Sequence, residues 1–218
     1  MIAIVNRISD NDFDYYKAKI DECNGYWVKL DEDNPEYERV LSKVGGVLIT
    51  GAEDKGKFDL GIVRYALKHN LAIFGICQGI QDMVMAVSDE SHIVPVRNHK
   101  YEYTPDEYYH RVDILDDSIL YNIIKQVSIN VNSTHNYQCY DVGDKNIFRV
   151  SAICSDTKLH GIYPNKGVIE GIENPNHAFQ IGVQWHPEIL SNENSKRLFT
   201  RFINVSNYIY SIRGRFSS

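Results

Sequence analysis

The sequence is poor in the features that mark several classes of protein. Its four cysteines, at positions 23, 77, 139 and 154, show no paired C-x-x-C spacing. Neither a disulfide framework nor a cysteine-based zinc site is expected, and we expect no metal and no cofactor. No apolar run approaches the roughly 20 residues of a membrane span, and the apolar start, residues 1–5, lacks the basic residues of a signal peptide. We therefore expect a reducing, cytoplasmic setting without membrane contact.

An excess of basic charge is also absent. Lys and Arg number 23 against 29 Asp and Glu, which gives a net charge of −6, and no block of like charges stands out. This balance argues against a nucleic-acid partner or an anionic membrane surface, so the expected partner is a small molecule. With 218 residues, 43% of them hydrophobic, the chain is expected to form one domain over residues 1–218 with a proper core.

Short apolar runs alternate with amphipathic segments through the first 90 residues. Strands are predicted at residues 2–5, 25–30, 46–50 and 71–76. Helices are predicted around 15–20 with a cap near Asp12, through 40–41, over 59–70 and over 80–87. Alternation of this kind predicts an α/β fold, with a mostly parallel central sheet flanked by helices on both faces.

The second half of the chain has a different pattern. Residues 89–106 are polar and rich in tyrosine, and we expect a long loop over the carboxyl edge of the sheet. Short β-like runs follow at 110–114, 127–131, 148–153, 167–172 and 179–184. These runs predict antiparallel pairs added to one edge of the sheet. A terminal helix is expected over 192–203, with residues 208–218 as a helical extension that frays into a tail.

The stretch around Cys77 carries the strongest chemical signal. An apolar run leads into Gly75-Ile76-Cys77-Gln78-Gly79, after which apolar residues recur at helical spacing. Glycines two residues either side of Cys77 fit a turn too tight for side chains, as in a nucleophile elbow with Cys in place of Ser. The sulfur would then lie at the amino end of a helix, where the dipole favours the reactive thiolate. A buried structural cysteine is the commoner fate of an apolar-flanked Cys, but the paired glycines favour a nucleophile.

A cysteine nucleophile needs a base, and His186 is the candidate. The strand at 179–184 would deliver His186 at its end, while Pro187 stops the strand and sets a turn before Glu188. One imidazole nitrogen could then face Cys77 while Glu188 accepts a hydrogen bond from the other, as the acid does in a Ser-His-Asp triad. A lone histidine at a strand end is more often a satisfied surface residue, and this alternative stays open.

The two motifs FGICQGIQ (74–81) and VQWHPE (183–188) together resemble the class I glutamine amidotransferase superfamily. They are most similar to its γ-glutamyl hydrolase-like, peptidase C26-like branch, which includes the γ-glutamyl-γ-aminobutyrate hydrolases. The resemblance spans residues 2 to about 202. It implies a flavodoxin-like class I amidotransferase fold, with Cys77 as nucleophile, His186 as general base and then acid, and Glu188 as the orienting carboxylate.

The resemblance also implies an oxyanion hole made of backbone N–H groups. One donor would be the N–H of Gln78, and the other would come from the turn at Gly51-Ala52; each such donor is typically worth a few kcal/mol of barrier. The family usually has a second glycine where this chain has Ala52. A left-handed backbone at Ala52 would be strained, and we expect an imperfect hole if the turn requires one.

Three further residues are implied to bind substrate. Gln81 stands where the family contacts the amino-acid end of the γ-glutamyl group, and Ser133 and His135 fall in a segment that lines the same pocket. Asn136 replaces a second histidine that the hydrolase branch often carries, so the contacts of the leaving group differ here. Specificity for the amine is expected from loops such as residues 89–110.

Three functions are compatible with the resemblance. The first is a cysteine-dependent hydrolase that cleaves the γ-glutamyl amide bond of glutamine or of a γ-glutamyl amine through a thioester. The alternative is a glutaminase subunit that supplies ammonia to a separate synthetase partner. A third is a degenerate relative that only binds a γ-glutamyl ligand, which the retention of Cys77, His186 and Glu188 disfavours. The long polar loops favour the stand-alone hydrolase.

Overall fold

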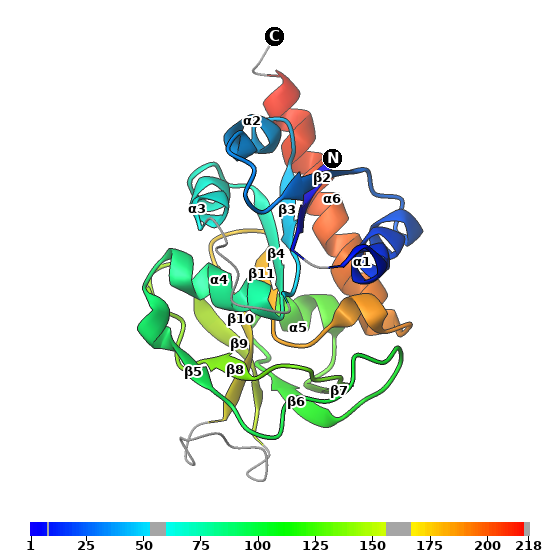
Figure 1. Ribbon diagram of the computed structural model, residues 1–218, viewed down its shortest axis with the longest axis vertical. Helices are drawn as coiled ribbons and strands as arrows, with labels where there is room; N and C mark the ends of the chain where they lie inside the picture. Colours follow the sequence, from blue (N-terminus) through cyan, green and yellow to red (C-terminus); the bar gives the residue numbers. More distant parts are fainter. Residues whose placement is uncertain (8, 53–59, 156–166, 216–218) are drawn as a thin grey trace.

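A nine-stranded sheet forms the centre of the molecule, in the order β2-β1-β3-β4-β11-β10-β9-β6-β7 (Figure 1). The structure is a computed structural model that describes residues 1–7, 9–52, 60–155 and 167–215. Five neighbouring strands run parallel: β2 (Trp27–Asp31), β1 (Ile2–Asn6), β3 (Gly46–Ile49), β4 (Ala72–Ile76) and β11 (Gln180–Val183). Four more continue the sheet in antiparallel pairs: β10 (Val168–Glu173), β9 (Arg149–Cys154), β6 (His110–Ile114) and β7 (Ser128–Val131). The predicted α/β class, with parallel strands and an antiparallel edge, is confirmed.

Strand β11 joins the two halves of the sheet, and here the predicted pairing is correct on one side only. Residues 179–184 were expected in an antiparallel edge pair, but β11 lies parallel to β4 and is antiparallel only to β10. Val183 is the register partner of Ile76, and the Cys77 N–H donates to the Val183 carbonyl at 2.9 Å. Because the two strands end side by side, the residues that follow each of them meet at the carboxyl edge of the parallel strands.

Helices cover both faces of the parallel part, as expected. They are α1 (Asp10–Glu22), α2 (Tyr37–Leu41), α3 (Gly61–Lys68), α4 (Gln78–Ala86) and α6 (Glu193–Arg215). A further helix, α5 (Ile119–Ile124), packs on α6 and on the antiparallel strand β9. In Figure 1, α3 and α4 lie to the left of β3 and β4, while α1 and α6 lie to the right. Among the described residues, none of these helices combines the length and the hydropathy that crossing a bilayer would require.

The ends of several helices differ from the prediction. The cap of α1 is Ser9, whose Oγ accepts from the Asp12 N–H at 3.3 Å, so the predicted cap near Asp12 was one turn late. The terminal helix is a single element through Arg215, because apolar residues on α6 continue to pack on the sheet. The first residue of the predicted helix at 59–70, Asp59, and the tail at 216–218 lie outside the described residues.

Four of the short elements in the described residues were not predicted: η1, β5, β8 and α5. The segment expected to be a long loop contains a 3₁₀ turn η1 (Glu90–His92) and a strand β5 (Ile93–Pro95), which pairs with β8 (Tyr137–Cys139) in a second, two-stranded sheet. Three-residue strands leave no periodicity to detect. Helix α5 is six residues long, and its first N–H groups, those of Ile119 and Leu120, are capped at 3.0 Å by the distant carboxylate of Glu173. Local sequence does not reveal such a cap.

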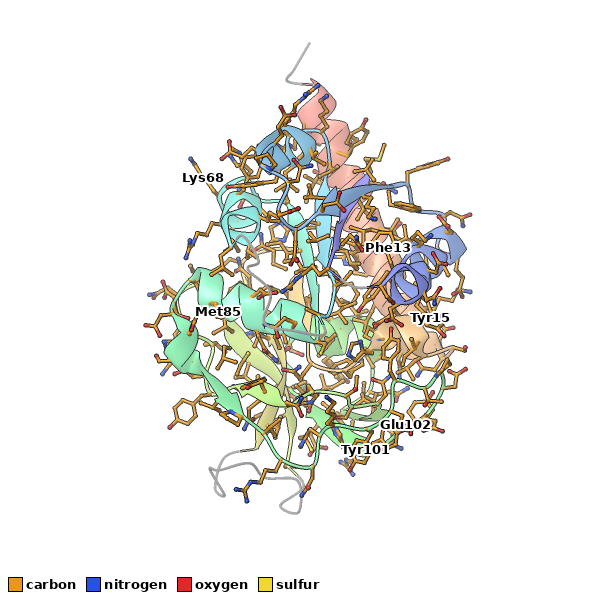
Figure 2. All side chains as sticks on the ribbon, viewed as in Figure 1. Phe13, Tyr15, Lys68, Met85, Tyr101 and Glu102 are labelled. Atoms are coloured by element: carbon orange, nitrogen blue, oxygen red, sulfur yellow. The ribbon has the colours of Figure 1, made fainter. Side chains whose placement is uncertain are left out.

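The core fixes the strand that leads to Cys77. The Phe74 ring on β4 meets the rings of Phe179 and Phe199 edge-on, with centroids 5.4 and 5.2 Å away. All three side chains are fully buried, and truncating one such phenylalanine typically costs about 3–5 kcal/mol. On the outside, Tyr101 and Glu102 mark the exposed segment before β6 (Figure 2).

Candidate active site

Cys77 occupies the corner between β4 and α4, in a strained backbone conformation. Its φ is +54° and its ψ is −105°, and it is the N-cap of α4. A non-glycine residue in this region costs on the order of 1–3 kcal/mol and persists only where its surroundings enforce it. A Cβ on Gly75 would lie 2.7 Å from the Gly79 carbonyl oxygen, and one on Gly79 would lie 2.4 Å from that of Ile49. The reason given for both glycines from the sequence is confirmed.

His186 lies beside Cys77 across Gly51. A methyl group placed on Gly51 would be 3.2 Å from His186 Cε1 and 3.6 Å from Cys77 Cβ. Both side chains line one cavity of about 650 Å³. His186 is only 6% exposed, so the alternative of a solvated surface histidine is excluded. The structure thus brings together the two motifs that the sequence singled out.

Glu188 completes the arrangement. His186 Nδ1 and Glu188 Oε1 are 2.6 Å apart, and both residues are buried. Since an ionised carboxylate can only accept, Nδ1 carries a proton and Nε2 is left for the side of Cys77. Burial lowers the pKa of His186, but the negative charges of Glu188 and Cys77 outweigh it and raise this pKa to about 10. The imidazole is therefore charged at neutral pH.

Two residues that the sequence analysis missed hold this pair in place. The side chain of Asn132 grips the backbone of His186: Nδ2 donates to the carbonyl at 2.8 Å and Oδ1 accepts from the N–H at 2.7 Å. The Tyr103 hydroxyl donates to Glu188 Oε1 at 2.9 Å. Burial, then the charge of Glu188, raises the pKa of Tyr103, so it keeps its proton and remains a donor. Asn132 stands in the same short segment as His135, but only the fold brings it to His186.

The predicted oxyanion donors lie around the same cavity. Gln78 is the first residue of α4, and Gln78, Gly51 and Ala52 all line the cavity. The Gly51 N–H already donates to the Tyr16 hydroxyl at 3.2 Å, which leaves Ala52 as the better candidate from this turn. Ala52 is not among the residues with positive φ in the described part of the chain. The condition under which we expected strain at Ala52, a left-handed backbone, is therefore not met.

The predicted substrate-binding residues fall into two groups. Gln81 and His135 line the cavity, and Gln81 Nε2 donates to the Tyr137 carbonyl at 3.1 Å, which fixes its side chain. Ser133 does not line it: the side chain is fully buried and its hydroxyl donates to the His99 carbonyl at 2.6 Å. Ser133 therefore supports the wall from behind.

Charges of both signs also line the cavity. Asp12 comes from the first turn of α1, and Lys100 comes from the segment before β6, where it forms an isolated bridge with Thr134. Lys100 is exposed, and Asp12 is half-buried. A ligand that carries an ammonium and a carboxylate could find a counter-charge for each.

The chain is similar to several characterised proteins. It is 28% identical over 207 residues to CTP synthase of Methanosphaera stadtmanae, which covers 83% of this chain and 37% of that enzyme. The chain thus spans well under half the length of this relative. It is 27% identical over 206 residues to γ-glutamyl-γ-aminobutyrate hydrolase PuuD of Escherichia coli, which covers 77% of this chain and 74% of that protein.

The fold matches a solved glutaminase domain. The glutaminase domain of Trypanosoma brucei CTPS, solved with bound acivicin, superposes with a TM-score of 0.73 at 17% identity, over 95% of this chain and 93% of that one. The family model of Peptidase C26 matches residues 53–188, which is more than half of the chain and includes Cys77, His186 and Glu188. The resemblance drawn from the two motifs is confirmed, and the chain belongs to the Peptidase C26 family.

Proposed function

We propose that the protein hydrolyses the γ-glutamyl amide bond of glutamine or of a γ-glutamyl amine, through a thioester on Cys77. The observation that carries this proposal is the strained Cys77, held at the N-terminus of α4 beside the His186–Glu188 pair in one cavity. A nucleophile, a base and a group that orients the base are the parts that covalent catalysis requires. Membership of the Peptidase C26 family supports the same reaction class.

The first half-reaction begins from the charge state of the pair. His186 holds its proton at neutral pH, and Cys77 acts as the thiolate. The sulfur attacks the side-chain carbonyl carbon, and the oxygen, now negative, accepts hydrogen bonds from the N–H groups of Gln78 and Ala52. As the intermediate collapses, the C–N bond breaks and the leaving amine takes the proton from His186 Nε2. The product is a γ-glutamyl thioester on Cys77, with His186 now neutral.

The second half-reaction reverses the proton transfer. Neutral His186 accepts a proton from water, whose oxygen attacks the thioester carbon. Collapse of this intermediate breaks the C–S bond, returns the Cys77 thiolate and releases glutamate. Throughout both steps Glu188 accepts a hydrogen bond from the N–H at His186 Nδ1, and it stabilises the imidazolium each time the imidazolium forms.

The charges at the cavity suit the amino-acid end of the substrate. A γ-glutamyl group carries an α-ammonium and an α-carboxylate. Asp12 offers a negative charge for the ammonium, and Lys100 offers a positive charge for the carboxylate. Gln81, fixed on the Tyr137 carbonyl, adds a neutral polar contact. His135 forms part of the same wall, and Ser133 supports it.

A glutaminase that supplies ammonia to a synthetase is the second candidate. It is favoured by the similarity to CTP synthases, of which this chain matches only about two fifths. The stand-alone hydrolase is favoured by the similarity to PuuD, because this chain matches 74% of the length of PuuD. The two differ in one measurable respect, which is whether the chain turns over substrate without a partner.

The test is a screen of the purified chain alone, with glutamine and a set of γ-glutamyl amines, in which released glutamate is measured. A hydrolase releases glutamate from at least one γ-glutamyl amine, and the Cys77→Ala variant releases none. Turnover of glutamine only, slow and raised by an added synthetase, would support the second candidate. Glutamate release that persists in folded Cys77→Ala protein would contradict both.

A further inference from the structure

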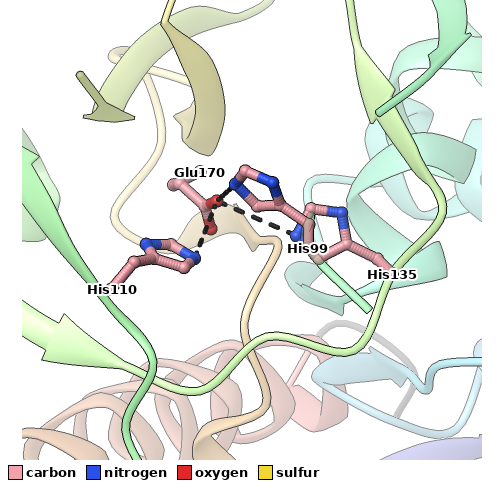
Figure 3. A group of neighbouring side chains, drawn as sticks. All are labelled: His99, His110, His135 and Glu170. Atoms are coloured by element: carbon pink, nitrogen blue, oxygen red, sulfur yellow. Dashed lines mark ion pairs between the residues drawn. The ribbon is translucent and has the colours of Figure 1, made fainter. Parts of the chain in front are cut away.

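A second cluster of polar side chains lies beneath the wall of the cavity. Three histidine rings surround one carboxylate: His99, His110, His135 and Glu170 (Figure 3). None is more than 6% exposed, and His99 and Glu170 are completely buried. The catalytic roles proposed above do not account for Glu170, His99 or His110.

The ring nitrogens of the cluster point at a common centre. The Nε2 atoms of His99, His110 and His135 lie 3.8, 3.4 and 3.8 Å from Glu170 Oε1. One ligand atom from each of the four residues lies within 4.8 Å of every other. In a tetrahedral zinc site with bonds of about 2.0–2.1 Å, the ligand atoms are about 3.4 Å apart. Binding would draw ligand atoms that now lie up to 4.8 Å apart to about 3.4 Å from one another.

His99 and His135 carry their ring protons on Nδ1, as metal-binding histidines that bind through Nε2 do. Nδ1 of His99 lies 3.0 Å from the Arg97 carbonyl oxygen, and Nδ1 of His135 lies 3.0 Å from that of Tyr137. A carbonyl only accepts, so each Nδ1 carries the proton and a neutral ring presents a lone pair at Nε2. Backbone carbonyls that hold the outer nitrogen in this way fix the tautomer of a metal ligand.

Glu170 and His135 therefore face each other as acceptors. Both oxygens of Glu170 and Nε2 of His135 are buried, without a hydrogen-bond partner among the described residues. Such groups are costly to bury unpaired. A proton shared between Glu170 and His135 would satisfy one contact, whereas a cation at the centre of the cluster would pair with Glu170 and His135 together.

We propose that His99, His110, His135 and Glu170 bind one divalent transition-metal ion, for which Zn²⁺ is the best fit. Three imidazole nitrogens and one carboxylate oxygen suit zinc, whereas Ca²⁺ and Mg²⁺ prefer oxygen ligands alone. Four protein ligands in a buried position describe a closed, structural site rather than one that activates water. The expectation of no metal rested on the cysteines, and these histidines have no recognisable spacing in the sequence.

Such an ion would join segments that form the wall of the catalytic cavity. His99 precedes Lys100, and His135 lies between Thr134 and Asn136; Lys100, Thr134, His135 and Asn136 line the cavity. The other two ligands belong to the sheet, with His110 at the start of β6 and Glu170 within β10. The ion would therefore fasten the pocket wall to the antiparallel half of the sheet.

The test is the zinc content and stability of the full chain, prepared without a polyhistidine tag. Because a reactive thiol can itself bind zinc, the measurement is made in the Cys77→Ala variant as well. After treatment with a chelator and reloading, both proteins should hold one Zn²⁺ per chain through gel filtration and melt at a higher temperature than the metal-free form. Cobalt loaded in its place should give the visible absorption of a tetrahedral ion, without a sulfur-to-metal band.

Matched variants assign the ligands. Glu170→Gln and His110→Gln should lower the zinc content by about tenfold or more, whereas His177→Gln, which removes a histidine outside the cluster, should leave it unchanged. If the two ligand variants fail to fold, the titration of the Cys77→Ala protein decides. Failure of that protein to take up one equivalent of zinc, with an unchanged melting temperature, would overturn the proposal, as would full zinc content in folded Glu170→Gln protein.

Discussion

The hydroxyl of Tyr103 donates to Oε1 of Glu188, the same oxygen that accepts from His186 Nδ1. The Tyr103 ring also meets the His186 ring edge-on, with centroids 5.0 Å apart. A residue from the segment before β6 therefore fixes both the acid and the base that follow β11. Tyr103 thus positions the two residues that we propose as base and orienting acid, and it takes part in no bond-making step of the proposed mechanism.

Removing the Tyr103 hydroxyl should weaken the orientation of the base. A hydrogen bond to a charged group is worth roughly 1.5–3 kcal/mol, so Tyr103→Phe is expected to lower kcat by about tenfold with little change in KM. Steady-state kinetics on a γ-glutamyl amine would measure this. Tyr101→Phe, on the same segment but stacked on Tyr109 at the surface, is the control. A rise in KM alone would instead make Tyr103 a substrate contact.

The charged state of His186 predicts that kcat/KM falls at alkaline pH. The imidazolium is present below its pKa of about 10 and is lost above it, so kcat/KM for an amide should fall as pH rises through that value. Alkylation of Cys77 by iodoacetamide needs no proton donor and should not fall with it. Glu188 helps to raise this pKa, and Glu188→Gln should therefore shift the alkaline limb to lower pH. An unmoved limb in the variant would contradict the assigned pair.

The raised pKa of His186 also links folding to pH. Because the folded-state pKa of about 10 exceeds the ordinary value of 6.5, protonation of His186 stabilises the folded state fully below pH 6.5. This stabilisation is lost as pH rises through about 10. Replacing His186 by Gln should flatten the stability profile between these limits, measured by urea unfolding at several pH values.

The two hydrogen bonds between the Asn132 side chain and the His186 backbone predict that replacing Asn132 lowers stability and activity together. Asn132→Leu keeps the approximate size of the side chain but leaves the buried N–H and C=O of His186 unpaired, at a cost of about 1–3 kcal/mol each. Both the free energy of unfolding and kcat should fall. Asn130→Leu, on the exposed side of β7, is the matched control. A stable variant with full activity would show that His186 is held by other contacts.

The turn after β3 gives opposite expectations at two neighbouring positions. A side chain on Gly51 would meet His186 Cε1 at 3.2 Å, so Gly51→Val should abolish turnover by displacing the base. Ala52 has no positive φ, so Ala52→Gly relieves no strain and should leave turnover unchanged, or lower it by adding flexibility. Saturation kinetics on folded variants test both. A clear gain in turnover for Ala52→Gly would show that the turn is strained after all.

The sequence predicted those parts of the molecule that are encoded locally. Strand, glycine-flanked turn and helix around Cys77 appear in consecutive residues, and so do His186, Pro187 and Glu188. The pairing of β11 with β4 could not be predicted in this way, because β4 lies far earlier in the sequence. The neighbour that is close in sequence, β10, runs in the opposite direction. The antiparallel pairs were predicted correctly, including that of β11 with β10, but the parallel pairing of β11 with β4 was not predicted.

The supporting residues were missed for the same physical reason. Asn132, Tyr103 and Glu170 act through contacts with residues far along the chain. Nothing in their immediate neighbours distinguishes Tyr103 from the other tyrosines of that segment, or Glu170 from an ordinary strand residue. Family resemblance indicated the residues that we propose as nucleophile, base and acid, but it did not indicate what holds them.

The central claim is that Cys77 carries the γ-glutamyl group as a thioester. The direct test is to mix the chain with a γ-glutamyl amine, quench in acid within the first turnovers, and map the adduct by peptide mass spectrometry. We predict a γ-glutamyl adduct on Cys77 that hydroxylamine removes, and no adduct in Cys77→Ala protein. Glutamate release without any adduct on Cys77, or an adduct on Cys23 instead, would contradict the account.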